Sequence, residues 1–163
     1  MSQPWLRATI PITKPIVYVD MDGVLCDFDK RVQELKLLGI NPNQADNHEK
    51  AFKDLEPLPG ALEAWEHLQE NYETYVLSTA PWRNLASWTE KRIWVEKYLG
   101  KSAHKKLILT HNKGLLIGHY LIDDRIANGV ADFKGEHLHF GSEKFPDWKS
   151  ITSYLDSKVL CNI

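Results

Sequence analysis

The sequence predicts an α/β fold, a Rossmann-like open parallel sheet with helices on both faces and a small helical cap insertion. Short apolar runs recur along the chain, each bounded by polar or turn residues, as buried parallel strands tend to be. Segments with helical spacing lie between these runs, and such alternation is typical of an open parallel sheet. Since 163 residues suit one domain with a real core, we expect a single domain over residues 1–163.

Five apolar runs are expected to form the strands. Each is about five residues long, which is the usual length of a strand in a globular protein. They are IVYVD (16–20), TYVLS (74–78), KLILT (106–110), YLID (120–123) and HLHF (137–140).

Three helices are expected between or after these strands, over residues 59–71, 84–100 and 146–155. The first begins behind Pro59, and the second ends at Gly100, a residue that favours helix C-termini. Trp65, Trp88 and Trp94 lie at helical spacing and are expected in the core.

Residues 29–58 do not follow the alternation of strand and helix. They contain a helical stretch, KRVQELKLLG, a turn-rich GINPNQADN and then HEKAFKDLEPLP. Because they directly follow the acidic loop after the first strand, we interpret them as a reduced cap over the carboxyl edge of the sheet. The alternative is a long first crossover without a functional role.

Composition narrows the classes of function. A net charge of -2 and a pI near 6.4 give no overall attraction to nucleic acid or to a membrane. No stretch approaches the ~18 apolar residues of a membrane span, and the N-terminus lacks an apolar signal core. Cys26 and Cys161 fit neither a metal-ligand spacing nor a disulfide framework. We expect a soluble, cytoplasmic protein and predict no particular oligomeric state.

Chemically capable side chains follow four of the predicted strands. Because parallel strands end at one edge of a sheet, these residues should converge there. Carboxylates in this number suit a hard divalent cation, Mg²⁺ first. The residues are Asp20 and Asp22, Thr79 with Ala80, Lys113, and Asp123 with Asp124.

These groups match the demands of phosphoryl transfer, which are positioning and charge neutralisation. A carboxylate can attack phosphorus and form an aspartyl-phosphate. A second carboxyl group two residues on can protonate the leaving oxygen and later deprotonate water. Thr79 and nearby backbone N–H groups can bind phosphate oxygens, and Lys113 supplies a positive charge, although Lys91 could replace it.

The order DxDG, Thr, Lys and Asp-Asp resembles the four motifs of the haloacid dehalogenase (HAD) phosphatase superfamily, here Asp20-Met21-Asp22-Gly23, Thr79, Lys113 and Asp123-Asp124. Within it, the strings DMDGVLCDF, LEPLPGALEA, LSTAPW, EKRIWVEKYLG, LTHNKG and LIDDR are similar to the 5'(3')-deoxyribonucleotidase family. The resemblance implies a HAD-like fold and an enzyme that hydrolyses a small phosphomonoester, a (deoxy)nucleoside 5'- or 3'-monophosphate. No nucleic acid polymer or membrane is implied as a partner.

The resemblance also implies residue roles. Asp20 is the expected nucleophile and Asp22 the general acid and base. Mg²⁺ would be held by the Asp20 side chain, the Asp22 backbone carbonyl and one of the terminal pair, with Asp124 favoured over Asp123. Thr79 and Lys113 would bind phosphate.

Further positions are carried over from the family pattern. Lys91 and Arg83 match basic residues that face the site, and Phe28 matches an aromatic beside the nucleotide. Ala80 replaces the usual second Ser and leaves only a backbone donor. The cap is shorter than in the family, and Phe52 is expected at its end, outside the base pocket.

Remaining side chains have less specific expectations. Trp82 is expected either to border the substrate or to play no part, whereas His111 is expected at the surface. Asp27 is expected at a helix start, where acids are favoured.

Two alternatives remain beside the nucleotidase. The same chemistry could serve another small metabolite, such as a sugar phosphate, because the predicted cap is short. A phospho-accepting signalling receiver also combines a sheet, Mg²⁺, Asp, Thr and Lys. A receiver, however, lacks an acid two residues after the acceptor, which Asp22 supplies here.

Overall fold

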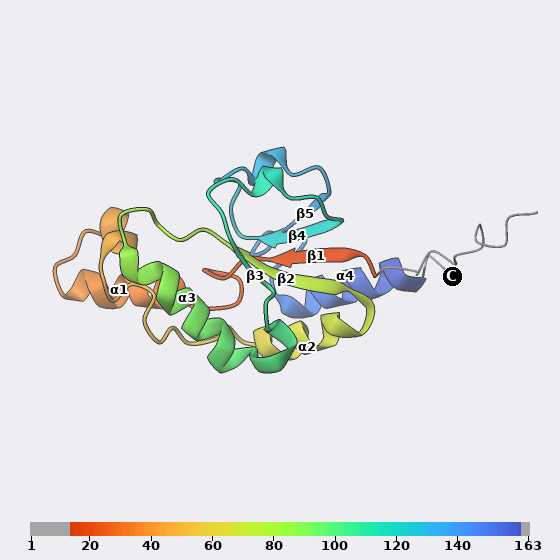
Figure 1. Ribbon diagram of the computed structural model, residues 1–163, viewed down its shortest axis with the longest axis horizontal. Helices are drawn as coiled ribbons and strands as arrows, with labels where there is room; N and C mark the ends of the chain where they lie inside the picture. The colour runs from red at the N-terminus through yellow and green to blue at the C-terminus, as the bar shows by residue number, and fades with distance from the viewer. Residues whose placement is uncertain (1–13, 161–163) are drawn as a thin grey trace, which may run out of the picture.

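Five parallel strands form the centre of the molecule in the computed structural model, which describes residues 14–160. Their order across the sheet is β3-β2-β1-β4-β5 (Figure 1). The predicted open parallel α/β sheet is therefore confirmed. The strands are β1 (Ile16–Val19), β2 (Glu73–Ser78), β3 (Leu107–Leu109), β4 (Tyr120–Asp123) and β5 (Glu136–His139).

In this described part of the chain four α-helices accompany the strands: α1 (Phe28–Leu37), α2 (Ala61–Asn71), α3 (Leu85–Tyr98) and α4 (Trp148–Leu160). Short 3₁₀ helices occupy four connections: η1 (Pro42–Asn47), η2 (Gly100–Ala103), η3 (Lys113–Leu115) and η4 (Val130–Asp132). No helix among residues 14–160 has the length and apolarity needed to cross a membrane.

The two faces of the sheet are covered differently. Strand residues such as Val17 and Val19 share one core with α2, α3 and α4, which lie together beneath the sheet in Figure 1. Alternate residues such as Tyr18 pack on the other face against Val130 and Phe133, in and beside η4. On that face the prediction of helices needs correction, because the connections 110–119 and 124–135 carry only 3₁₀ helices.

Tryptophan burial follows the prediction at two of three positions. Trp65 and Trp94 are buried in the main core. Trp88 was expected there too, but 36% of it is exposed, and it packs beside His111. Helical spacing alone could not show that Trp88 lies beside His111 and is partly exposed, rather than in the core with Trp94.

The segment between β1 and α2 contains α1, η1 and a series of turns. Asp27 begins α1 as expected, since its side chain accepts a hydrogen bond from the Lys30 N–H. At the base of the segment the Asp27 N–H donates to the Glu56 carbonyl and the Leu58 N–H to the Leu25 carbonyl. Figure 1 shows α1 and η1 beyond the end of the sheet toward which β1 points.

Candidate active site

Asp20 lies directly after the last residue of β1, and only 7% of it is exposed. Its backbone N–H donates to the Ile122 carbonyl of β4, which fixes the residue at the sheet edge. The Lys113 ammonium lies 2.9 Å from Asp20 Oδ1. A buried carboxylate therefore has a positive partner and also lines the cavity described below.

Lys113 joins Asp20 to Asp123. Its ammonium lies 2.5 Å from Asp123 Oδ2 and is buried with both carboxylates. Burial alone would lower the pKa of Lys113, but the charges of Asp20 and Asp123 outweigh it and raise that pKa. Lys113 is therefore a permanent cation at the carboxyl edge of the sheet.

Asp22 has a separate cationic partner. Lys91, on α3, is 1% exposed, and its ammonium donates to Asp22 Oδ2 at 2.5 Å and to the Ser78 hydroxyl at 3.1 Å. Burial raises the pKa of Asp22, and the positive charge of Lys91 opposes this shift. Lys91 was expected to bind phosphate; in the structure its ammonium is paired with Asp22, and Lys91 is not itself among the residues that line the cavity described below.

The adjacent carboxylates Asp123 and Asp124 are bonded differently. Both oxygens of Asp123 accept hydrogen bonds, one from Lys113 and one from the Arg125 N–H. In contrast, Asp124 Oδ1 is buried without a hydrogen-bond partner among residues 14–160, which is costly for a carboxylate. Burial, with the nearby charge of Asp20, raises the pKa of Asp124 to about 6.

These carboxylates fit a divalent cation. Asp20, Asp123 and Asp124 each offer an oxygen, and these atoms lie within 4.8 Å of one another. An all-carboxylate set of this kind suits a hard cation, and the unpartnered Asp124 oxygen supplies a free ligand. Gly23 has a φ of +76°, and a Cβ there would lie 2.4 Å from Asp124 Oδ2, so the motif glycine makes room for this carboxylate.

Thr79 and Ala80 follow β2, and the structure treats them differently. Thr79 lines the cavity, where its hydroxyl donates to the Thr110 carbonyl at 2.8 Å. Ala80 is fully buried and is not among the lining residues. The side chain of Ala80 therefore does not reach the cavity.

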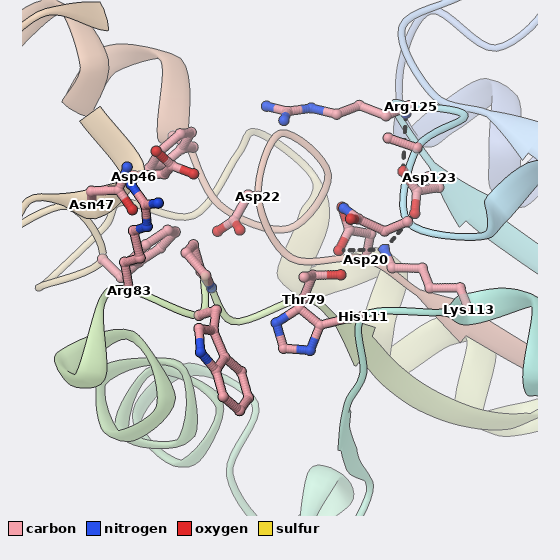
Figure 2. Close-up of a pocket in the computed structure, with 16 residues that line it drawn as sticks. Asp20, Asp22, Asp46, Asn47, Thr79, Arg83, His111, Lys113, Asp123 and Arg125 are labelled. Atoms are coloured by element: carbon pink, nitrogen blue, oxygen red, sulfur yellow. Dashed lines mark hydrogen bonds and ion pairs between the residues drawn. The ribbon is translucent and has the colours of Figure 1, made fainter. Parts of the chain in front are cut away.

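A cavity of about 270 Å³ brings these groups together with the segment after β1. Asp20, Asp22, Thr79, Lys113 and Asp123 line it (Figure 2). Phe28, Trp82 and Arg83, which the sequence placed near substrate, line it as well. Its volume is slightly below the ~300–1,000 Å³ typical of ligand pockets.

Phe52 was expected outside the pocket, and that prediction is wrong. Phe52 lines the cavity and stacks on Phe28 with ring centroids 5.1 Å apart and planes 6° from parallel. The ammonium of Lys91 lies 4.4 Å from the Phe52 ring centroid. The short segment therefore supplies an aromatic pair despite its length.

Sequence reasoning missed several lining residues. Arg125 directly follows the Asp pair, which was a local signal for it. His111 was expected at the surface; it is exposed, but it also borders the cavity and contacts Trp82. Asp46 and Asn47 had no local signal, because tertiary packing alone places η1 beside the site.

Comparison with known proteins agrees with this geometry. The family model of "5' nucleotidase, deoxy (Pyrimidine), cytosolic type C protein" matches residues 41–153. A protein of Vibrio phage KVP40 that carries the name 5'(3')-deoxyribonucleotidase is 50% identical over 147 residues, covering 89% of this chain and 86% of its own. The human cytosolic-type 5'(3')-deoxyribonucleotidase is 30% identical over 166 residues, covering 83% and 77% respectively.

Solved structures agree on the fold. A haloacid dehalogenase-like family hydrolase of Xanthomonas campestris aligns with a TM-score of 0.54 at 9% identity, covering 89% of this chain and 96% of its own. A HAD-type hydrolase of Bacillus subtilis bound to magnesium aligns with a TM-score of 0.52 at 10% identity, covering 83% and 90%. The sequence relatives show that the chain belongs to the 5'(3')-deoxyribonucleotidase family, and its fold is the one that HAD-like hydrolases have.

Proposed function

We propose that the protein is a Mg²⁺-dependent phosphomonoesterase that hydrolyses (deoxy)nucleoside 5'- or 3'-monophosphates to nucleoside and phosphate. One observation carries the proposal: Asp20 and Asp22 line one cavity but have separate partners, Lys113 and Lys91. Two acids in different surroundings can take different roles in one reaction. The names of the phage and human relatives support a nucleotide as substrate.

In the proposed first step, an Asp20 oxygen attacks phosphorus and the bond from phosphorus to the leaving oxygen breaks. Asp22 transfers its proton to that leaving oxygen, so the nucleoside departs as a neutral alcohol and an aspartyl-phosphate remains. Burial raises the pKa of Asp22, which favours the protonated form that this step requires. Lys113 is proposed to hold a phosphate oxygen during the step, and Thr79 to hold another once its hydroxyl turns away from the Thr110 carbonyl.

In the second step, the Asp22 carboxylate removes a proton from water, and the water oxygen attacks phosphorus. The bond between phosphorus and Asp20 then breaks, which releases inorganic phosphate and restores both acids. Lys91 holds Asp22 through its 2.5 Å contact, so the same carboxylate is in place for both proton transfers. Asp123 positions Lys113 beside Asp20 rather than reacting itself.

The side chains of Asp20 and Asp124 and the Asp22 backbone carbonyl are the proposed Mg²⁺ ligands. When bound, Mg²⁺ would neutralise charge on the phosphate and the carboxylates. The unpartnered Asp124 Oδ1 supports the choice of Asp124 over Asp123, whose oxygens both accept hydrogen bonds from the protein.

Residues 29–58 are proposed to act as a reduced cap. Asp46, Asn47 and Phe52 of this segment line the same cavity as Asp20, which supports a role beyond a simple crossover. The human relative's cytosolic designation supports a cytoplasmic location as part of the same proposal.

The reaction is tested by Asp20→Asn with Asp27→Asn as a matched control. Both changes replace a carboxylate by an amide, but Asp27 serves as the α1 N-cap, a role that asparagine fills equally well. We expect Asp20→Asn to lose at least about 10³-fold in kcat, equivalent to about 4 kcal/mol, while Asp27→Asn keeps full activity. Hydrolysis by Asp20→Asn near the wild-type rate would exclude Asp20 as nucleophile.

The substrate is tested with a panel of deoxynucleotides, ribonucleotides and sugar phosphates, with and without Mg²⁺. We expect deoxynucleoside monophosphates to have the highest kcat/KM. If sugar phosphates are preferred by about 100-fold, equivalent to about 2.7 kcal/mol in transition-state binding, the protein is a phosphatase of another metabolite.

A further inference from the structure

We infer that Asn84 is a positioning residue for substrate selection, because it fastens the cap residues Asp46 and His48 to the start of α3. Two hydrogen bonds from Asn84 fix a polar wall of the cavity, formed by Asp46, Asn47 and Arg83, which would contact the nucleoside part of the substrate. The inference rests on the proposed function and adds to it the residues that would recognise the nucleoside.

Asn84 connects two segments through one side chain. Its amide nitrogen donates to the Asp46 carbonyl at 2.9 Å and to the His48 carbonyl at 2.8 Å. Its amide oxygen accepts from the Ser87 N–H at 3.2 Å and caps α3. Only 3% of Asn84 is exposed, so water competes little for these bonds.

The residues next to these bonds form the wall. Asp46 and Asn47 line the cavity, as does Arg83, which directly precedes Asn84. In Figure 2 these three side chains lie on one side of the cavity, and Asp20, Lys113 and Asp123 lie on the other. A phosphoryl group held at Asp20 would therefore direct the rest of its molecule toward the wall.

We expect the polar wall, rather than the aromatic pair of Phe28 and Phe52, to select the substrate. Phe28 and Phe52 stack on each other and are only 7% and 3% exposed, so they offer a substrate ring little surface to stack on. The wall, in contrast, offers the acceptor Asp46, the donor Arg83, and Asn47, which can do both. Such groups bind the hydroxyl and amino groups of a nucleoside, which a simple aryl phosphate lacks.

The rest of the cap is attached at other points. Trp94 donates its indole N–H to the Leu55 carbonyl at 2.8 Å, and backbone hydrogen bonds join residues 25–27 to 56–58. Loss of the Asn84 bonds should therefore displace the Asp46–His48 turn while the base of the cap stays in place.

Asn84→Asp isolates this role. Aspartate retains the oxygen that caps α3 and is an equally good N-cap, but it replaces the amide donor with a carboxylate that faces two carbonyl oxygens. We expect kcat/KM for the best deoxynucleoside monophosphate to fall about 30-fold, mainly through KM, since two hydrogen bonds are lost. For para-nitrophenyl phosphate, which has no nucleoside, kcat/KM should stay within about twofold.

The result is judged by the ratio of kcat/KM for the two substrates. An unchanged ratio overturns the inference, whether both activities fall together or neither falls, because a purely structural role would affect both substrates alike. A second measurement combines Asn84→Asp with Asp46→Ala. We expect the double variant to lose little more kcat/KM on the nucleotide than either single variant, because both changes act through one wall. Fully additive losses would contradict the inference. If wild-type protein hydrolyses neither substrate with Mg²⁺ present, the proposed function itself is refuted, and the inference with it.

Discussion

Gly23→Ala tests whether the motif glycine makes room for a metal ligand. The new Cβ would lie 2.4 Å from Asp124 Oδ2, whereas ordinary contacts begin near 3.4 Å, so the carboxylate must move by about 1 Å. Mg²⁺ requires ligands at ~2.0–2.1 Å in near-ideal octahedral geometry, and a displacement of this size would remove Asp124 as a ligand. The positive φ of +76° adds a strain of about 1–2 kcal/mol for any residue with a Cβ.

Gly39→Ala is the matched control, because Gly39 has a φ of +84° and a Cβ added there would meet no atom of the described residues within 4 Å. Both variants should lose the same ~1–2 kcal/mol from backbone strain. Saturating Mg²⁺, at about 100 times its Kd, should raise the Tm of wild type and Gly39→Ala by roughly 5–10 °C. Gly23→Ala should show a much smaller rise at the same concentration. An equal rise in both variants would refute the role of Gly23 beside Asp124.

Two further changes test the buried charges and the core. Lys113→Met should lower the free energy of unfolding in urea by about 3–5 kcal/mol, because it leaves buried Asp20 and Asp123 without their cation. As a control, Lys106→Met breaks the more exposed ion pair with Glu73 and should lower the same free energy by at most about 1 kcal/mol. Tyr72 donates its hydroxyl to the Leu155 carbonyl, and burial raises its pKa to about 12. The stability that Tyr72 contributes should be complete below pH 10 and lost as pH rises through about 12. In Tyr72→Phe the unfolding free energy, measured by circular dichroism, should therefore fall less steeply at alkaline pH. An unchanged slope would contradict this.

The gathering of the candidate site residues at the carboxyl edge of the sheet could be predicted because its signals are local. Four of the five strands are short apolar runs with a candidate residue at or shortly after the carboxyl end: Asp20 follows β1, Asp123 ends β4, and Lys113 comes a few residues after β3. Parallel pairing then brings these residues to one edge without further information. The order of strands and polar residues along the sequence was therefore enough to predict that Asp20, Lys113 and Asp123 converge.

The roles of Lys91, Asp46 and Asn47 could not be predicted in this way. Lys91 reaches Asp22 across 69 residues of sequence, and its burial depends on how α3 packs against the sheet. Asp46 reaches the cavity because Asn84, 38 residues later, binds its carbonyl. Helices were expected on the second face of the sheet for the same lack of tertiary information. Whether the short connections 110–119 and 124–135 form α-helices or 3₁₀ helices depends on the path between the strands they join.

Charge balance explains why so many acids can share this edge. Asp20, Asp22, Asp123 and Asp124 carry four negative charges when ionised, and the buried ammonium groups of Lys91 and Lys113 carry two positive ones. The guanidinium of Arg125 lies 3.9 Å from Asp124 on a largely exposed side chain and offsets little of the remainder. With all four acids ionised, the site thus retains two formal negative charges, and one of these acids, Asp124, has a buried oxygen without a hydrogen-bond partner among residues 14–160. A divalent cation bound there, as proposed, would offset this charge, so the ion proposed for the reaction would also stabilise the cluster of acids in the folded protein.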